Sequence, residues 1–174
     1  GSSNSMFGWS ADKRSIYISS NKRNPRYFDI LKADTATWNF TMFFQNDSGY
    51  NANDISYTEK YITLSKSITT DKNELYLYDR ANKTMKKLSN DNEATWGSSG
   101  FEKNDSTLYY TTNDGDEFSY LVKYNINSGK ADKFYSTNWD VNGMSLSENE
   151  KYHTIFVNED GKNKVLLFDH ASNK

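Results

Sequence analysis

Residues 9–18 read Trp9-Ser10-Ala11-Asp12-Lys13-Arg14-Ser15-Ile16-Tyr17-Ile18, a short apolar start followed by a polar turn and a run of strand-forming residues. The same pattern returns three times, at residues 55–64, 101–110 and 146–155. The copies begin 46, 46 and 45 residues apart. Repetition with a period of this length is typical of propellers, solenoids and other repeat arrays. The repeat therefore decides the fold class before any single residue is considered.

Inside each repeat, apolar and polar residues alternate as they do in β-strands. In the second copy Ile62 and Leu64 alternate with Tyr61, Thr63 and Ser65, and alternation over four to eight residues indicates a strand. No helical stripe of apolar residues is sustained anywhere in the chain. A second strand-like run follows each copy, at residues 28–31, 75–79, 120–125 and 165–169.

Polar turn segments rich in Asn, Asp, Ser and Gly separate these runs. For the third copy they predict strands at residues 98–101, 107–112, 119–124 and 131–135. Four antiparallel strands in about 45 residues is the size of one β-propeller blade. A β-sandwich is the alternative, but it has no reason to repeat its turn chemistry at one period. We therefore predict an all-β protein, a β-propeller built of four four-stranded blades.

We expect the propeller to occupy residues 6–174, with residues 1–5 a remnant of cloning. The predicted blades cover residues 6–50, 51–95, 96–140 and 141–174. The last blade is incomplete, because the sequence stops where its outermost strand should begin. A closed ring of four blades, an arc of a larger propeller and a dimer of two arcs are all compatible with this pattern, and the incomplete blade favours the arc. Because terminal repeats expose their packing faces, we also expect self-association through the arc ends.

The composition excludes several classes of protein. The 174 residues carry a net charge of −2, which offers no basic surface for nucleic acid. No apolar stretch approaches the length of a membrane span, so we expect no membrane partner. Cysteine is absent, which excludes disulfides and thiol chemistry. The lack of cysteine and of a leader favours the cytoplasm, with the periplasm as the alternative.

The repeats resemble a known family of blades. Residues 9–13, followed by Ile16-Tyr17-Ile18, are similar to the Trp-Ser-x-Asp-Gly-Lys motif of TolB-type propellers and of the propellers of prolyl-oligopeptidase-type serine peptidases. Residues 19–30, 74–79 and 117–124 resemble the N-terminal propeller half of the dipeptidyl and acylaminoacyl peptidase relatives, and the resemblance covers nearly all of residues 7–170. The sequence departs from the motif at Lys13, where the family has Gly, and at Ile55, Phe101 and Leu146, which replace Trp9.

The resemblance implies that the family's chemistry lies outside this sequence. Its Ser-Asp-His triad belongs to an α/β-hydrolase domain, with the Ser in a Gly-x-Ser-x-Gly elbow. No such pentapeptide occurs in the chain, and the nearest strings, at residues 8–11 and 97–100, lack the spacing. We therefore expect no catalytic residue here, and a parent protein that is a serine hydrolase.

The two histidines do not suggest a catalytic or metal site. His153 occupies the strand position of Ile16, Ile62 and Leu108 in the other copies, so we expect it to be a packed or hydrogen-bonded strand residue; His170 falls in a terminal turn. With two histidines and no cysteine, a zinc site is not expected, and we predict no cofactor and no metal. Trp38, Trp96 and Trp139 are expected to pack within blades, although an exposed one would offer a binding surface.

Two clusters remain as candidate binding sites. Residues 113–117 gather three carboxylates around Gly115, but their spacing does not match a calcium loop, and a solvated hairpin is the simpler interpretation. In relatives, an acidic pair of the propeller holds the amino terminus of a substrate, which makes Asp116 and Glu117 candidates by resemblance. Arg23 and Arg26 flank the only proline; each could bind a substrate carboxylate, pair with the hydrolase domain, or pair with Asp29 inside the blade.

The sequence therefore supports two functions from different classes. The first is a non-catalytic propeller segment of a prolyl-oligopeptidase-type serine peptidase, which gates access to the hydrolase domain and contributes to recognition of a peptide substrate. The second is a stand-alone TolB-like propeller that acts as a scaffold for protein–protein interaction.

Overall fold

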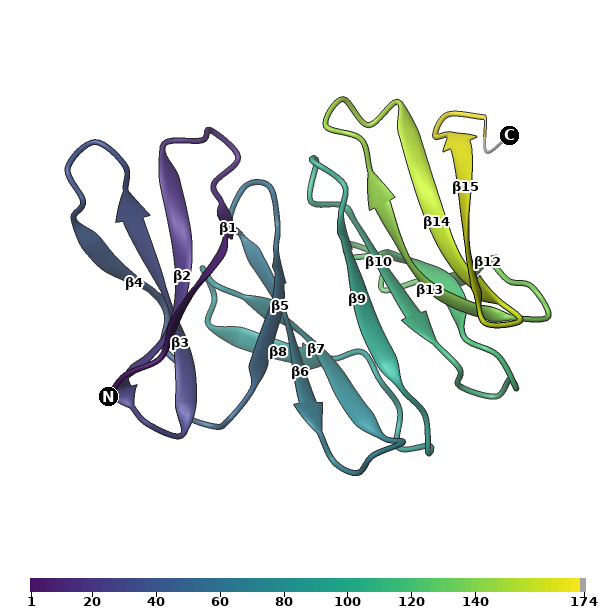
Figure 1. Cartoon of the computed structure of the whole chain (residues 1–174), viewed down its shortest axis with the longest axis horizontal. Coiled ribbons are helices and arrows are strands. Elements are labelled where there is room, and N and C mark those ends of the chain that lie inside the picture. Colours follow the sequence, from purple (N-terminus) through teal and green to yellow (C-terminus); the bar gives the residue numbers. More distant parts are fainter. Residues whose placement is uncertain (173–174) are drawn as a thin grey trace. The chain divides into compact units, whose positions relative to one another are not determined.

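The computed structural model describes residues 1–172, which form β-strands, turns and loops and no helix (Figure 1). Fifteen strands make four antiparallel sheets in chain order. Sheet 1 contains β1 (Asn4–Trp9), β2 (Ser15–Asn24), β3 (Tyr27–Asp34) and β4 (Phe40–Phe44). Sheet 2 contains β5 (Asn51–Ile55), β6 (Tyr61–Ser67), β7 (Asn73–Asp79) and β8 (Thr84–Lys87). Sheet 3 contains β9 (Trp96–Phe101), β10 (Thr107–Thr112), β11 (Tyr120–Asn125) and β12 (Ala131–Tyr135).

Sheet 4 contains three strands within the described residues, β13 (Asp140–Leu146), β14 (Tyr152–Glu159) and β15 (Lys162–Asp169). The all-β prediction with an incomplete last blade is thus confirmed. The chain forms two compact units, Gly1–Ala52 with sheet 1 and Asn53–Lys174 with sheets 3 and 4 and most of sheet 2. No segment of residues 1–172 forms a helix that could cross a membrane.

Within the second unit the sheets pack face to face. Leu75 and Leu77 of sheet 2 contact Leu108, Tyr110 and Val122 of sheet 3 in one apolar cluster. The opposite face of sheet 3 joins sheet 4 in a second cluster, made of Tyr109, Leu121, Val141, Met144, Ile155 and Val157. Sheet 3 is therefore buried on both faces, because neighbouring residues of a strand point to opposite sides. Each buried apolar side chain of this size contributes about 1.5–3 kcal/mol to stability.

The repeated motif forms the same turn in each sheet. In sheets 1, 2 and 4 a serine hydroxyl at its start accepts the backbone N–H five residues later: Ser15 N to Ser10 Oγ at 2.9 Å, Tyr61 N to Ser56 Oγ at 3.0 Å and Tyr152 N to Ser147 Oγ at 3.0 Å. One residue of each turn has a positive φ: Lys13 (59°), Glu59 (63°), Asp105 (54°) and Glu150 (55°). Glycine adopts this left-handed backbone without steric cost, which explains its presence at that position in the family motif, and Lys13 keeps the turn with a φ of 59°.

The first strand starts before the predicted propeller. Asn4 and Ser5, which we predicted to be a remnant of cloning, belong to β1 and pair with Ser20 and Ser19 of β2. The Ser20 hydroxyl also donates a 2.6 Å hydrogen bond to Asn4 Oδ1. These two residues therefore complete the edge of sheet 1.

Candidate functional site

Arg23 lies near the end of β2, and its guanidinium binds three groups of its own unit. Nε and Nη2 donate to the two carboxylate oxygens of Asp29 at 2.8 Å each. Nη2 also donates to the backbone oxygen of Asn46 at 2.8 Å, and Nη1 lies 2.9 Å from Asp47 Oδ1. The sequence analysis left three possible partners for Arg23: a substrate carboxylate, the hydrolase domain and Asp29. The structure shows the ion pair with Asp29.

Asp29 is buried and stays ionised because of these contacts. Burial opposes the ionisation of its carboxyl group, but the hydrogen bonds from Arg23 and from the backbone N–H of Asn46 outweigh it and lower the pKa of Asp29. In return, hydrogen bonding to Asp29 raises the pKa of Arg23. The cluster connects the two central strands of sheet 1, β2 and β3, to the segment after β4.

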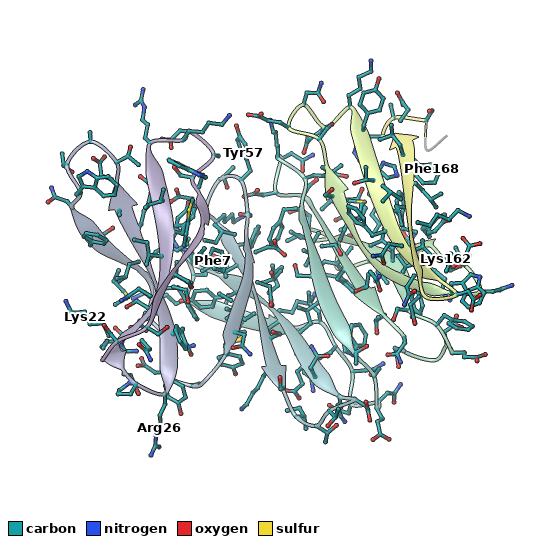
Figure 2. All side chains as sticks on the ribbon, in the orientation of Figure 1. Phe7, Lys22, Arg26, Tyr57, Lys162 and Phe168 are labelled. Atoms are coloured by element: carbon teal, nitrogen blue, oxygen red, sulfur yellow. The ribbon has the colours of Figure 1, made fainter. Side chains whose placement is uncertain are left out.

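Arg26 is placed differently, in the tight turn between β2 and β3. Its backbone N–H bonds to Asn24 Oδ1 at 3.0 Å, which fixes the turn. The side chain is exposed and extends away from the sheet (Figure 2). Of the two arginines, Arg23 is engaged by Asp29, Asn46 and Asp47, whereas the exposed guanidinium of Arg26 is the more accessible to a ligand.

The acidic candidates lie in the second unit, in the connection between β10 and β11. Asp116 accepts a 2.9 Å bond from Lys133 Nζ, which lowers the pKa of its carboxyl group. The same ammonium lies 3.9 Å from the ring centroid of Tyr120. Glu117 is exposed, and its backbone N–H bonds to Asp116 Oδ1. The loop is a hydrogen-bonded hairpin, in which the backbone N–H of Asp116 also bonds to the backbone oxygen of Asn113 at 3.0 Å.

The candidates therefore do not assemble into one site within either unit. Arg23 and Arg26 belong to Gly1–Ala52, whereas Asp116 and Glu117 belong to Asn53–Lys174. In the part of the chain that the structure describes, no group of three or more His, Cys, Asp or Glu side chains is arranged to hold a metal ion.

A buried polar cluster between sheets 3 and 4 was missed by the sequence reasoning. Glu102 Oε1 accepts a 2.9 Å bond from Tyr109 Oη and lies 3.2 Å from Lys123 Nζ and 3.5 Å from His170 Nε2. Burial opposes the ionisation of Glu102, but bonds from Thr107, Tyr109 and Lys123 lower its pKa. A signal was present in the sequence, because Glu102 replaces the serine that starts the turn in the other three copies.

His153 is packed beside this cluster, as its repeat position predicted. It is buried and stacks on Phe168 with ring centroids 5.2 Å apart, and His170 meets it edge-on at 5.5 Å. Within residues 1–172 the Nδ1 atoms of both imidazoles are buried without a hydrogen-bond partner. Burial, then the charges of His170 and Lys123, lower the pKa of His153, while Asp169 opposes them.

We expect His153→Leu to stabilise the protein, and more so in acid. The pKa of His153 lies below its ordinary value of 6.5, so the unfolded chain takes up this proton first as the pH falls. The wild type therefore loses stability below about pH 6.5. The variant does not, because leucine, which the third repeat has at the equivalent position 108, cannot be protonated. We expect a gain of about 1–2 kcal/mol at pH 5 and less at pH 8, measured by urea unfolding. An equal gain at both pH values would contradict the assigned protonation.

The three tryptophans that were expected to pack within blades differ in how far they are buried. Trp96 is buried and packs on Tyr110, with ring centroids 5.7 Å apart, as predicted. The prediction is wrong for Trp38, which is exposed in the turn between β3 and β4, where its φ is 56°. Trp139 is partly exposed and contacts Phe118, with ring centroids 6.2 Å apart. Trp38 lies in the turn, outside the strands whose alternation places side chains on the faces of the sheet.

Comparison with known proteins shows the fold alone. No family model matches the chain, and no curated relative is found. TolB from Acinetobacter baumannii aligns over 98% of this chain and 42% of its own, with 16% identity and a TM-score of 0.72. Prolyl oligopeptidase B from Galerina marginata, bound to a 35mer substrate, aligns over 98% and 26%, with 16% identity and a TM-score of 0.69.

A puromycin-hydrolysing peptidase from Mycobacterium tuberculosis aligns over 100% of this chain and 31% of its own, with 9% identity and a TM-score of 0.69. The chain thus spans less than half the length of each of these three proteins. Their common element is a β-propeller, and the four sheets of this chain are propeller blades of the TolB and prolyl oligopeptidase type.

Proposed function

We propose that the chain is the non-catalytic propeller segment of a prolyl-oligopeptidase-type serine peptidase, and that it gates access to an α/β-hydrolase domain. The observation that carries the proposal is the fold similarity to peptidases that are three to four times longer, over nearly all of this chain. The chain corresponds to a part of those proteins, and its sequence contains no Gly-x-Ser-x-Gly elbow.

The placement of the histidines supports a role without catalysis. A triad base must lie within hydrogen-bond reach of its nucleophile and of an orienting carboxylate. His153 is enclosed by Phe134, Phe168 and His170, and His170 faces Glu102. Both imidazoles act in the packing of sheets 3 and 4, which suits a rigid blade.

The proposed contribution to the peptidase is exclusion and partial recognition. A propeller beside a hydrolase site admits short, flexible peptides and keeps out folded proteins and bulk water. For recognition, the structure favours Arg26 over Arg23 as the group for a substrate carboxylate, because the fork of Arg23 is occupied by Asp29. Glu117 is likewise favoured over Asp116, which binds Lys133.

A hydrolysis assay tests the proposal. The purified chain, incubated with peptide, ester and acyl-peptide substrates, should give no turnover above a blank purified in the same way. Activity that co-elutes with the chain through a second chromatographic step would contradict it. For the parent protein, the reading frame after Lys174 should encode a Gly-x-Ser-x-Gly elbow, followed by the Asp and His of a triad.

The alternative function is a stand-alone TolB-like scaffold for protein–protein interaction. The alignment with TolB over 98% of this chain favours this alternative, because TolB has a comparable fold over this length. A reading frame that continues with further blades alone, or that stops, would select the scaffold over the peptidase.

A further inference from the structure

Asn142 and Gly143 form the only Asn-Gly pair in the sequence, and they lie in the middle of β13, the first strand of sheet 4 (Figure 1). Asn142 is exposed to solvent. Among residues 1–172 no hydrogen bond holds its side-chain amide. The amide is therefore free to turn toward the backbone that follows it.

Asn142 is also the extra residue of a β-bulge. Val141 pairs with Val157 and Gly143 pairs with Phe156, so Asn142 has no partner on β14. A bulge interrupts the hydrogen-bond ladder at its extra residue. The peptide bond between Asn142 and Gly143 is thus less restrained than one inside a regular strand.

The packing of sheet 4 on sheet 3 favours glycine after Asn142. Gly143 has a φ of 154°, and a Cβ on it would lie 3.3 Å from the hydroxyl oxygen of Ser99 in β9. A larger residue would have to displace this hydroxyl. Because glycine has no side chain, its backbone nitrogen is also the least hindered of any residue.

We propose that Asn142 is a site of spontaneous deamidation in the folded protein. The backbone nitrogen of Gly143 attacks Cγ of Asn142, so that a bond forms between these atoms and the bond from Cγ to Nδ2 breaks. Nδ2 leaves as ammonia and takes up the proton that the backbone nitrogen loses. Water then opens the five-membered imide at one of its two carbonyls, which gives aspartate or isoaspartate at position 142. The reaction needs water alone, with no oxidant, reductant or cofactor.

The two products should differ in their effect on the fold. In isoaspartate the main chain runs through the former side chain, so β13 becomes longer by one methylene between Val141 and Met144. These residues are 1% and 6% exposed and belong to the apolar cluster that joins sheets 3 and 4. A close-packed interface cannot keep both side chains in place along a longer strand. Aspartate adds only a charge at an exposed position, so we expect isoaspartate alone to weaken this contact.

Peptide mapping by mass spectrometry tests the proposal, which does not depend on the peptidase assignment. In mildly alkaline buffer the peptide that contains Asn142 should gain the mass difference between an amide and a carboxylic acid. An isoaspartyl methyltransferase with a labelled methyl donor measures the share of isoaspartate. Asn127 is the internal control, because it is exposed in the β11–β12 turn but precedes a serine. It should react more than about tenfold more slowly, and equal rates at the two residues would overturn the proposal.

The same measurement on the chain unfolded in urea tests the contribution of the bulge. In the folded protein Asn142 should react within about tenfold of its rate in the unfolded chain, because the bulge relieves the restraint of the ladder. If Asn142 reacted in the unfolded chain and stayed intact in the folded one, β13 would protect it and the proposal would fail.

Two variants separate the effect of the longer backbone from that of the charge. Glutamine forms the corresponding six-membered imide far more slowly, so aged Asn142→Gln should unfold at the same urea concentration as the fresh variant. Fresh Asn142→Asp has the charge on a normal backbone and should unfold like the fresh wild type. Aged wild type should unfold at a lower urea concentration, in proportion to its isoaspartate content. Isoaspartate-rich protein that unfolds like fresh protein would contradict the expected loss of packing.

Discussion

Arg23→Met is expected to lower the free energy of unfolding by about 3 kcal/mol, because it leaves the buried carboxylate of Asp29 without its counter-charge. Asp29 would keep one bond from the backbone N–H of Asn46, at 2.8 Å. It would lose both bonds from the guanidinium, and the backbone oxygen of Asn46 would lose its donor. Urea unfolding at pH 7 measures the loss.

The pH dependence distinguishes this cause from lost packing. In the wild type the lowered pKa of Asp29 stabilises the fold above the ordinary value of 3.8, and this contribution is lost as the pH falls through the folded-state pKa. In Arg23→Met the burial of Asp29 is no longer opposed by Arg23. We therefore expect part of the lost stability to return as the pH is lowered from 7 to 4.

Arg26→Met is the matched control, because it removes an exposed arginine from the same loop. We expect it to change the free energy of unfolding by less than about 0.5 kcal/mol. Arg23→Met together with Asp29→Leu should recover much of the loss, since neither charge then remains. Equal losses for Arg23→Met and Arg26→Met would show that the contacts of Arg23 with Asp29 and Asn46 do not stabilise sheet 1.

The strands were predictable because their signals are local. For the third copy, residues 98–101, 107–112, 119–124 and 131–135 were predicted, and β9 to β12 span Trp96–Phe101, Thr107–Thr112, Tyr120–Asn125 and Ala131–Tyr135. The alternation of apolar and polar residues indicates a strand, and a polar turn indicates where it ends. Both signals lie within a window of about ten residues. Because the pattern repeats, a strand predicted in one copy supports the strand predicted at the equivalent position of the others.

The candidate site was less predictable because its contacts are not local. The sequence left Arg23 with three possible partners, and the contacts to Asn46 and Asp47 depend on how the chain turns after β4. Lys133, which binds Asp116, comes from a strand that only the register of sheet 3 brings near. Pairings of this kind follow from tertiary structure and leave no periodic signal.

Departures from the repeat are informative when they are read in pairs. Glu102 replaces a serine in sheet 3, and His153 replaces an aliphatic residue in sheet 4. Each alone would place a polar group in an apolar interface at a cost of roughly 1–3 kcal/mol. In the structure they fall in one region, where His170 lies 3.5 Å from Glu102 and contacts His153 edge-on. The burial of Glu102 is offset by Tyr109 and Lys123 of its own sheet and by His170, whereas Nδ1 of His153 has no hydrogen-bond partner among the described residues.

Asp105→Ala is expected to lower the free energy of unfolding by about 3 kcal/mol. Asp105 is the residue with positive φ in the turn between β9 and β10, and it is buried. Its Oδ2 accepts the hydroxyl of Ser56 at 2.8 Å and that of Thr58, both from the equivalent turn of sheet 2. Glu150 makes a similar contact with the backbone N–H of Lys103, so these turns connect consecutive sheets in the second unit.

Two contributions to this loss are separable. Alanine removes the hydrogen bonds and also tolerates the left-handed backbone less well, whereas Asp105→Gly removes only the bonds and should cost about 1 kcal/mol less. Asp160→Ala is the control: Asp160 has a φ of 51° but lies exposed in the turn between β14 and β15. It should lose only the backbone contribution of about 1 kcal/mol. If Asp105→Ala and Asp160→Ala lost equal amounts in urea unfolding, the turns would not connect the sheets.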